Sequence, residues 1–215
     1  MTETSHQAPL HPALSASLRH RAVTEWAVSE MRRAQIAVLS NLLKAELQKR
    51  SRLSLMFICK HNARRSQLSE AWARAIVGSL GLPVDVSSGG SVPTEVHPSV
   101  VAALERAGFA VRERDPWSSV FVATTGPDAE PFELRSKRWD CMSSSDALVT
   151  VTNCAAAEES CPSVPGTVAR LALLYEDPQR SDGKPEERAT YEATSDRIGR
   201  ELSLLFRGVA DATRR

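Results

Sequence analysis

The chain has 215 residues, and 27 Lys and Arg nearly balance 26 Asp and Glu, which leaves a formal net charge of +1. This balance argues against a nucleic-acid partner held by charge alone, and no apolar run of about eighteen residues is present to cross a membrane. The polar N-terminal segment lacks the apolar core of a signal peptide. Four cysteines do not form a disulfide scaffold in a chain of this size, so we expect a cytoplasmic protein with catalytic or redox-active thiols.

The segment before residue 53 predicts an N-terminal helical extension. Residues 1 to about 12 are expected to be disordered. From residue 12 to residue 52, apolar residues recur at intervals of three and four, with charged residues on the other faces, which predicts one long helix or two shorter ones. These helices are a candidate surface for docking a partner or for forming a homodimer.

A core domain is predicted from residue 53 to about residue 210, where short apolar strands alternate with amphipathic helices. Strands separated by helices form a parallel sheet with helices on both faces, so the predicted fold class is α/β with a small four-stranded parallel sheet. Such sheets carry their sites at the C-terminal ends of the strands. The predicted strands are residues 53–58, 84–88, 147–152 and 168–173, and the predicted helices are residues 67–80, 98–107 and 187–207.

One segment, at about residues 113–140, interrupts this alternation of strands and helices. Two short β-prone segments flank the sequence Gly126-Pro127-Asp128, whose residue types are typical of turns. We therefore predict a hairpin that is inserted into the core domain.

Cys59 has the most informative surroundings in the chain. It follows the apolar segment 53–58 and begins the sequence Cys-Lys-His-Asn-Ala-Arg-Arg-Ser, which leads into a predicted helix. A loop between a strand and a helix N-terminus presents main-chain N–H groups that favour an anion, and it favours the thiolate of a cysteine placed there. Arg65 can bind a tetrahedral oxyanion with two parallel hydrogen bonds, which Lys cannot do, and Ser66 can donate a hydrogen bond to the sulfur.

These features make Cys59 the candidate nucleophile toward a phosphate-like oxyanion. The same spacing of Cys, Arg and Ser also arises by chance, but the preceding strand and the following helix supply the context that a functional motif requires. Asn62 can hold the loop from within, while the side chains of Lys60 and Arg64 either add positive charge or face water. The predicted oxyanion-binding residues are Lys60, His61, Asn62, Ala63, Arg64 and Arg65.

Cys154 and Cys161 flank a small, partly acidic segment just after the predicted strand 147–152. Taken alone, they are either two unrelated buried thiols or a zinc site, although their spacing is wider than in usual zinc pairs and no second Cys/His pair accompanies them. With Cys59 at a neighbouring strand end, a disulfide relay is a third interpretation. Cys154 would attack Cys59, and Cys161 would then attack Cys154, each thiolate displacing a sulfur.

Asp177 precedes Pro178 shortly after the predicted strand 168–173. A carboxylic acid at this place can protonate a leaving oxygen as a general acid. Asp-Pro is also common in simple turns, and the residues alone favour that interpretation.

Together these three features resemble the low-molecular-weight protein tyrosine phosphatase superfamily, and more closely its thioredoxin-coupled arsenate reductases. The resemblance covers about Leu53 to Phe206. The oxyanion loop of the family corresponds to Cys59–Ser66, its acid to Asp177, and its redox pair to Cys154 and Cys161. Plain phosphatases of the superfamily lack that cysteine pair, so the pair favours the reductases.

The chain also departs from the pattern of compact members of the superfamily. The usual loop has small residues where this chain has Lys60, His61 and Arg64, and both the N-terminal extension and the insertion are absent from compact members. The resemblance implies no tightly bound cofactor, although some members bind a potassium ion near the loop. The matching positions for potassium ligands are Asn62, Glu70 and Ser88.

The resemblance implies reduction of arsenate to arsenite. Cys59 would attack arsenate held by the loop and Arg65, and Asp177 would protonate the departing oxygen. Cys154 would then release arsenite by attacking Cys59, Cys161 would move the disulfide on to Cys154–Cys161, and thioredoxin would reduce it. Cys141 matches no position of the family and is expected to be a passive thiol.

Two alternatives accompany this expectation. A protein tyrosine phosphatase would use Cys59, Arg65 and Asp177 to form and hydrolyse a cysteinyl-phosphate, with Cys154 protecting Cys59 from oxidation. Such an enzyme needs an aromatic-lined cleft, which Trp117 or Trp139 of the insertion could supply. A non-catalytic thiol-based sensor or binding module is the second alternative, and the intact loop and acid argue against it.

Overall fold

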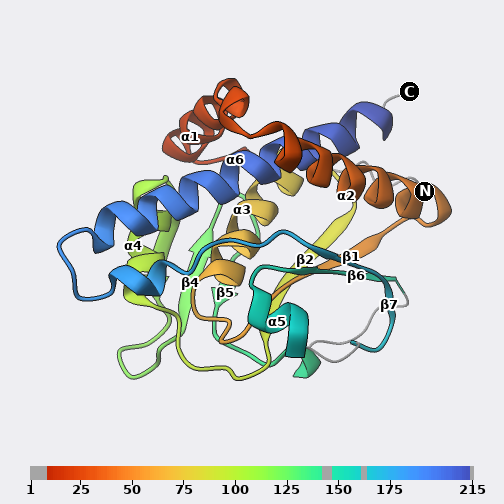
Figure 1. Cartoon of the computed structure of the whole chain (residues 1–215). Helices are drawn as coiled ribbons and strands as arrows, with labels where there is room; N and C mark the ends of the chain where they lie inside the picture. Colours follow the sequence, from red (N-terminus) through yellow and green to blue (C-terminus); the bar gives the residue numbers. More distant parts are fainter. Residues whose placement is uncertain (1–8, 142–146, 161–163, 214–215) are drawn as a thin grey trace.

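The computed structural model describes residues 9–141, 147–160 and 164–213. Its centre is a four-stranded parallel sheet with the strand order β2-β1-β6-β7 (Figure 1). This sheet confirms the predicted α/β fold class. The strands are β1 (Leu53–Cys59), β2 (Val84–Gly90), β6 (Leu148–Thr152) and β7 (Thr167–Ala172).

Helices cover both faces of this sheet. They are α3 (Arg65–Leu80), α4 (Pro98–Arg106), α5 (Ala155–Ser160) and α6 (Glu187–Thr213). Because successive strand residues point to opposite faces, Leu55 and Phe57 of β1 are buried in the main core with α3 and α6, while Met56 and Ile58 join a smaller apolar cluster with α5. Figure 1 shows α5 on the opposite side of the sheet from α3 and α6.

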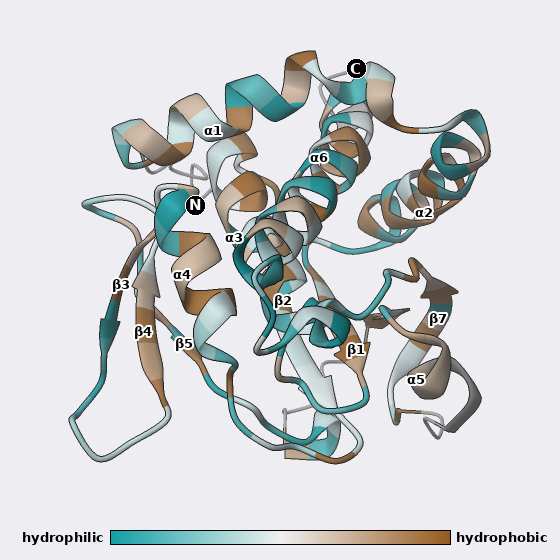
Figure 2. Ribbon diagram, turned by 60° about the vertical axis from the view of Figure 1, so that its left-hand side comes forward, coloured by the Kyte–Doolittle hydropathy of each residue, from teal (hydrophilic) through white to brown (hydrophobic). Residues whose placement is uncertain are grey.

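The N-terminal extension forms two helices separated by a short 3-10 turn. They are α1 (Pro12–Val23), η1 (Glu25–Ala27) and α2 (Glu30–Lys49). Ser29 caps α2, since its side chain accepts a hydrogen bond from the N–H of Arg32. Both helices lie against α6 (Figure 2), and Leu14, Leu39 and Leu43 are at most 1% exposed within the main core. The extension therefore shares the hydrophobic core of the sheet.

Disorder was expected up to about residue 12, but the structure describes the chain from residue 9 onward. Residues 1–8 lie outside the described residues. The N–H of His11, however, donates to the carbonyl of Thr125 at 2.9 Å, and its ring nitrogen lies 2.9 Å from Oγ1 of Thr124. These contacts fix the chain against the insertion just before Pro12 begins α1.

The insertion is a three-stranded antiparallel sheet, so the prediction of a hairpin was incomplete. Its strands are β3 (Ala110–Glu113), β4 (Phe121–Thr124) and β5 (Phe132–Leu134), in the order β3-β4-β5. The strand that sequence reasoning missed, β3, is short and largely exposed, and it has no run of alternating apolar residues to reveal it. After β5 the chain returns to the parallel sheet, where Gly90 forms a bridge with Arg138.

Two further short 3-10 helices complete the described elements, η2 (Trp139–Cys141) after the insertion and η3 (Pro178–Ser181) after β7. None of the described helices is long and apolar enough to span a membrane.

Candidate active site

The loop after β1 lies at the C-terminal edge of the parallel sheet, where such sheets place their ligands. Cys59 ends β1 and is 3% exposed, and α3 begins at Arg65, so residues 60–64 join a strand to a helix N-terminus as predicted. Gly90 of β2 lies directly against this loop, because a Cβ atom there would be only 2.8 Å from the main-chain nitrogen of Asn62. The close approach of the two backbones requires glycine at this position.

Neighbouring segments hold the main chain of the loop from outside. The carbonyl of Lys60 accepts from the N–H of Val92 at 2.9 Å, and the carbonyl of Ala63 accepts from the N–H of His97 at 3.1 Å. Within the described part of the chain, no main-chain N–H of residues 60–64 donates to a protein acceptor. The loop therefore keeps main-chain donors available for an anion.

A buried hydrogen-bond network surrounds the predicted nucleophile. Cys59 Sγ and Ser66 Oγ are 3.0 Å apart, and both residues are buried. Asn62 adopts a left-handed backbone conformation with φ of 48°, which asparagine tolerates better than most residues. Its side-chain amide donates to Ser66 Oγ and to Ser88 Oγ, both at 2.8 Å. The contact between Cys59 and Ser66 and the internal bridge by Asn62 are both as predicted.

Arg65 and Asp177 face each other across the site. The Arg65 guanidinium forms an ion pair with the Asp177 carboxylate and donates to the carbonyl of Tyr175 at 3.1 Å. Its Nε is buried and has no partner among the described residues. A buried donor without an acceptor is costly, so the guanidinium retains capacity to bind an oxyanion.

Asp177 forms the turn that the sequence favoured, and its role as an acid stays a prediction. It caps η3, because its side chain accepts from the N–H of Gln179 at 3.2 Å, and it also lies within contact of Arg65. The segment before it is tied to the N-terminal extension, since Arg32 of α2 donates to the carbonyl of Leu174 at 3.1 Å and to Glu201 of α6 at 2.9 Å. The extension thus helps to place the segment that carries the predicted acid.

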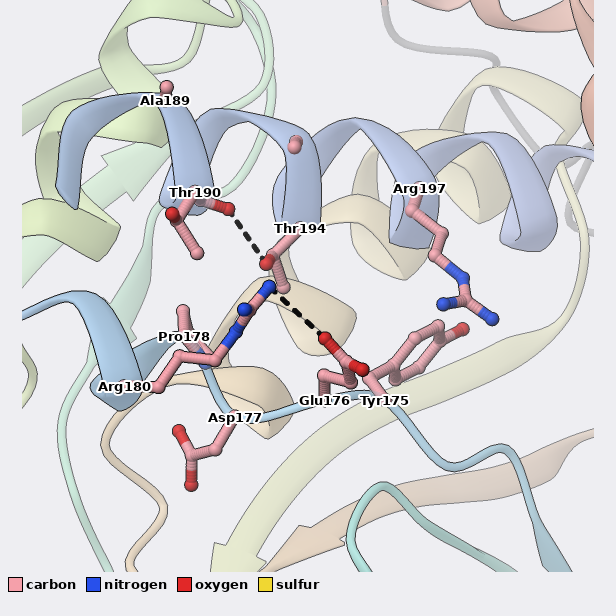
Figure 3. A pocket seen from close by; sticks show the side chains of 10 residues that line it. Tyr175, Glu176, Asp177, Pro178, Arg180, Ala189, Thr190, Thr194 and Arg197 are labelled. Carbon is pink, nitrogen blue, oxygen red and sulfur yellow. Dashed lines mark hydrogen bonds and ion pairs between the residues drawn. The ribbon is translucent and has the colours of Figure 1, made fainter. Parts of the chain in front are cut away.

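A hollow of about 360 Å³ lies between this acid-bearing segment and α6 (Figure 3). Its rim includes the ion pair between Glu176 and Arg180, and the Asp177 carboxylate points away from Thr190 and Thr194 on α6. Cys59 is not among the residues that line it. The hollow therefore adjoins the predicted acid but not the predicted nucleophile.

Arg64 does not point to the oxyanion loop, although it was predicted as a binding residue. Its guanidinium donates to Tyr191 Oη at 2.7 Å and to the Asp182 carboxylate at 2.6 Å. Burial opposes its charge, but the hydrogen bonds to Tyr191 and Asp182 raise the pKa of Arg64 above its ordinary value. The side chain thus anchors the start of α3 to α6. Of the other predicted loop side chains, Lys60 is exposed and His61 Nδ1 lies 3.0 Å from the carbonyl of Val92.

His97, Asp182 and Glu187 are the one group of described residues that converge like metal ligands. Arg64 and Tyr191 already bind the Asp182 carboxylate, and the Glu187 carboxylate accepts hydrogen bonds from Ser99 and from the N–H of Gly183. Both carboxylates of this group are thus already engaged by protein donors.

The three predicted potassium ligands do lie together. Ser88 donates to the Glu70 carboxylate at 2.5 Å, and Asn62 donates to Ser88. A lysine of the insertion, Lys137, places its ammonium 3.3 Å from the same Glu70 oxygen. Sequence reasoning missed this lysine, because it follows β5 and no local pattern links it to the loop.

Cys154 lies at the end of the neighbouring strand, two residues after β6. It is buried in the same small apolar cluster as Cys59, and its Sγ accepts from the N–H of Ala157 at 3.4 Å. Cys161 lies outside the described residues, so the predicted pairing with Cys154 stays a prediction. Cys141 is an exposed free thiol of η2.

Comparison with known proteins finds similarities to phosphatases and arsenate reductases. A family described as "Low molecular weight phosphotyrosine protein phosphatase" matches residues 54–118. An arsenate reductase of Bacillus licheniformis is 28% identical over 153 residues, which are 71% of this chain and 94% of that protein. An arsenate reductase of Halalkalibacterium halodurans is 28% identical over 152 residues, 70% of this chain and 93% of that protein. The solution structure of a low molecular weight protein tyrosine phosphatase from Bacillus subtilis is 18% identical, with a TM-score of 0.48, and covers 76% of this chain and all of that one.

Proposed function

The chain belongs to the low-molecular-weight protein tyrosine phosphatase superfamily, and from that premise we propose that it is an arsenate reductase. The single observation that carries the proposal is the contact between Cys59 and Ser66 at the end of β1, with Arg65 beside it at the start of α3. The arsenate reductases that resemble the chain match over nearly their whole length, which supports the choice of substrate.

In the first step, the Cys59 thiolate attacks the arsenic atom of arsenate. Main-chain N–H groups of the loop and the Arg65 guanidinium hold the oxygens and stabilise the charge that develops on them. Arsenate takes the place of Asp177 on Arg65, and the freed carboxylate takes up a proton from water and passes it to the leaving hydroxyl group. One S–As bond forms, one As–O bond breaks, and the oxygen leaves as water.

In the second step, the Cys154 thiolate attacks the sulfur of Cys59. A disulfide forms between these two residues, and the electron pair of the S–As bond passes to arsenic. Arsenic is reduced from the +5 to the +3 state and leaves as arsenite, while two thiols are oxidised. Burial of Cys154 in the apolar cluster that contains Cys59 supports this step.

In the third step, Cys161 attacks Cys154 and displaces the Cys59 thiolate, which leaves a disulfide between Cys154 and Cys161. A dithiol protein of the thioredoxin type then reduces this disulfide by two successive exchanges. The spacing of the two cysteines and the sequence match to arsenate reductases support the step.

Phosphatase activity is the second candidate, and the position of Trp139 favours it. This ring packs against the apolar cluster that contains Cys59, so an aromatic group lies near the oxyanion loop and could accompany a phosphotyrosine ring. Trp117 is 94% exposed within the insertion. In this reaction, Cys59 would attack phosphorus and displace the tyrosine oxygen, which leaves as the phenol after protonation by Asp177, and water would then hydrolyse the cysteinyl-phosphate to release phosphate and the thiol.

Arsenate-dependent NADPH oxidation with thioredoxin and thioredoxin reductase tests the proposal. Wild-type protein and the control Cys141→Ser are expected to turn over many times, whereas Cys161→Ser stops after the first disulfide forms. Hydrolysis of p-nitrophenyl phosphate is measured on the same samples. If none of the three proteins turns over arsenate and all three hydrolyse p-nitrophenyl phosphate, the protein is a phosphatase and not a reductase.

A further inference from the structure

Glu70 is a buried carboxylate that lies behind the oxyanion loop, and its side chain is 2% exposed. One of its oxygens accepts from Arg74 Nε at 3.1 Å. The other accepts from Ser88 Oγ at 2.5 Å and from Lys137 Nζ at 3.3 Å. The Lys137 side chain is itself only 9% exposed. A buried carboxylate is stable only when it is paired and hydrogen-bonded, and the Lys137 ammonium meets that requirement on one oxygen as the Arg74 guanidinium does on the other.

The ionised Glu70 sets the direction of a chain of hydrogen bonds that ends at Cys59. A carboxylate can only accept, so the Ser88 hydroxyl hydrogen points to Glu70, and Ser88 accepts from the Asn62 amide. The same amide group donates to Ser66. The Ser66 hydroxyl, which accepts from Asn62, is left to donate its hydrogen to Cys59 Sγ, 3.0 Å away.

Lys137 also fixes the orientation of the Asn62 amide. The side-chain oxygen of Asn62, Oδ1, accepts from the main-chain N–H of Lys137 at 2.9 Å and from Gln67 Nε2 at 3.0 Å. These donors prevent the amide from flipping, so its NH₂ group faces the two serines. The carbonyl of Lys137 accepts from the N–H of Gly90 at 2.9 Å, which ties the segment to β2.

A potassium ion does not fit among Asn62, Glu70 and Ser88 in this chain. Hard cations need oxygen ligands. The Asn62 amide presents its NH₂ group to Ser88, and the Ser88 hydroxyl hydrogen is directed to Glu70. The Glu70 oxygen that would serve the ion already holds the Lys137 ammonium. We therefore assign no potassium ion to these residues.

We propose that Lys137 is a built-in cation that holds the hydrogen-bond chain on Cys59 and makes the reactivity of this thiol independent of potassium. Lys137 is a positioning residue, since its ammonium acts through Glu70 and Ser88 and does not touch Cys59. The proposal rests on the assignment of Cys59 as the nucleophile, but it does not depend on which oxyanion is the substrate.

Alkylation of Cys59 by iodoacetamide at pH 6.5 tests this role without any substrate or thioredoxin. The modified Cys59 peptide is quantified by mass spectrometry, in choline chloride and in potassium chloride at equal ionic strength. Wild-type protein and the exposed control Lys49→Met are expected to react at the same rate in both salts. Lys137→Met is expected to react about tenfold more slowly in choline, because the Ser66 donor is no longer held in place.

Rescue separates a positioning role from a merely structural one. Lys137→Arg keeps a cation and is expected to recover most of the rate, and potassium is expected to accelerate Lys137→Met but not the double variant Glu70→Gln plus Lys137→Met. The double variant leaves neither Glu70 nor Lys137 as an unpaired buried charge. Its alkylation rate can therefore be measured even if Lys137→Met alone does not fold. Wild-type rates that rise with potassium, or a double variant that reacts at the wild-type rate, would overturn the proposal.

Discussion

The guanidinium of Arg65 and the carboxylate of Asp177 form an ion pair across the mouth of the oxyanion loop. The same Arg65 side chain has a buried Nε without a partner in the described part of the chain. An oxyanion that enters the loop therefore competes with Asp177 for Arg65. In the proposed reaction, displacement would release Asp177 from its positive partner before it takes up and donates a proton, so one exchange of partners would couple binding to acid catalysis.

Asp177→Asn should bind inorganic phosphate more tightly than the wild-type protein, because the competing carboxylate is gone. About a third of the Asp177 side chain is exposed, so we expect a gain of only about three- to fivefold in affinity. Turnover of arsenate should fall, since the amide cannot donate a catalytic proton. Isothermal titration with phosphate measures the affinity, and Glu176→Gln, which removes a neighbouring exposed carboxylate, is the control. Weaker phosphate binding by Asp177→Asn would contradict the competition.

Cys59→Ser should abolish both arsenate reduction and aryl phosphate hydrolysis, by more than about a thousandfold, because each reaction begins with the same thiolate. Cys141 is exposed and has no part in the proposed steps, so Cys141→Ser should retain both activities. The two assays are run on both variants after their thermal unfolding midpoints have been compared. Turnover by Cys59→Ser in either assay would remove the nucleophile assignment.

Leu43→Ala should destabilise the whole protein, even though the residue belongs to the N-terminal extension. Leu43 is fully buried against the main core, and truncation of a buried leucine costs about 2–5 kcal/mol. Val38 on the same helix is 57% exposed, so Val38→Ala should change the free energy of unfolding by less than about 0.5 kcal/mol. Urea titration followed by circular dichroism measures both values.

Deletion of residues 1–45 extends this test. It should remove cooperative folding of the remaining chain, because it exposes the part of the core that the extension covers. A truncated protein that unfolds cooperatively at the wild-type urea midpoint would show that the extension is only docked.

The sequence predicted those parts of the site that depend on local patterns. The apolar segment before Cys59, the helix after Arg65 and the Asp-Pro turn each have a short-range signal, and the structure places them together. The sequence singled out Arg65 as the residue that binds the oxyanion, but it left the direction of the Arg64 side chain open. In the structure Arg65 faces Asp177, while Arg64 turns to Tyr191 of α6, a partner 127 positions away that no local pattern indicates.

The contacts between the insertion and the oxyanion loop could not be predicted from the sequence either. The segment after β5 contacts the oxyanion loop through Ser136, whose hydroxyl donates to the carbonyl of His61 at 2.7 Å, and through Lys137. These contacts join residues about 75 positions apart, and neither residue belongs to a periodic pattern. Lysine side chains are also rarely buried in proteins, so nothing in the sequence predicts that Lys137 is buried.

Arg64→Met should lower the thermal unfolding midpoint at pH 7, and the deficit should shrink as the pH falls. Burial acts to raise the pKa of Asp182, but the hydrogen bond from Tyr191 and the pairing with Arg64 outweigh it and hold that pKa below its ordinary value. A carboxyl group with a depressed pKa in the folded state contributes stability that is present above its unfolded pKa of about 3.9 and is lost as the pH falls through the folded value. The variant lacks this contribution at neutral pH, so the two midpoints should converge between about pH 5 and pH 3. Differential scanning calorimetry across that range measures the gap, with the exposed Arg112→Met as the control. A gap that stays constant or widens in acid would mean that Arg64 stabilises the protein through packing and not through its charge.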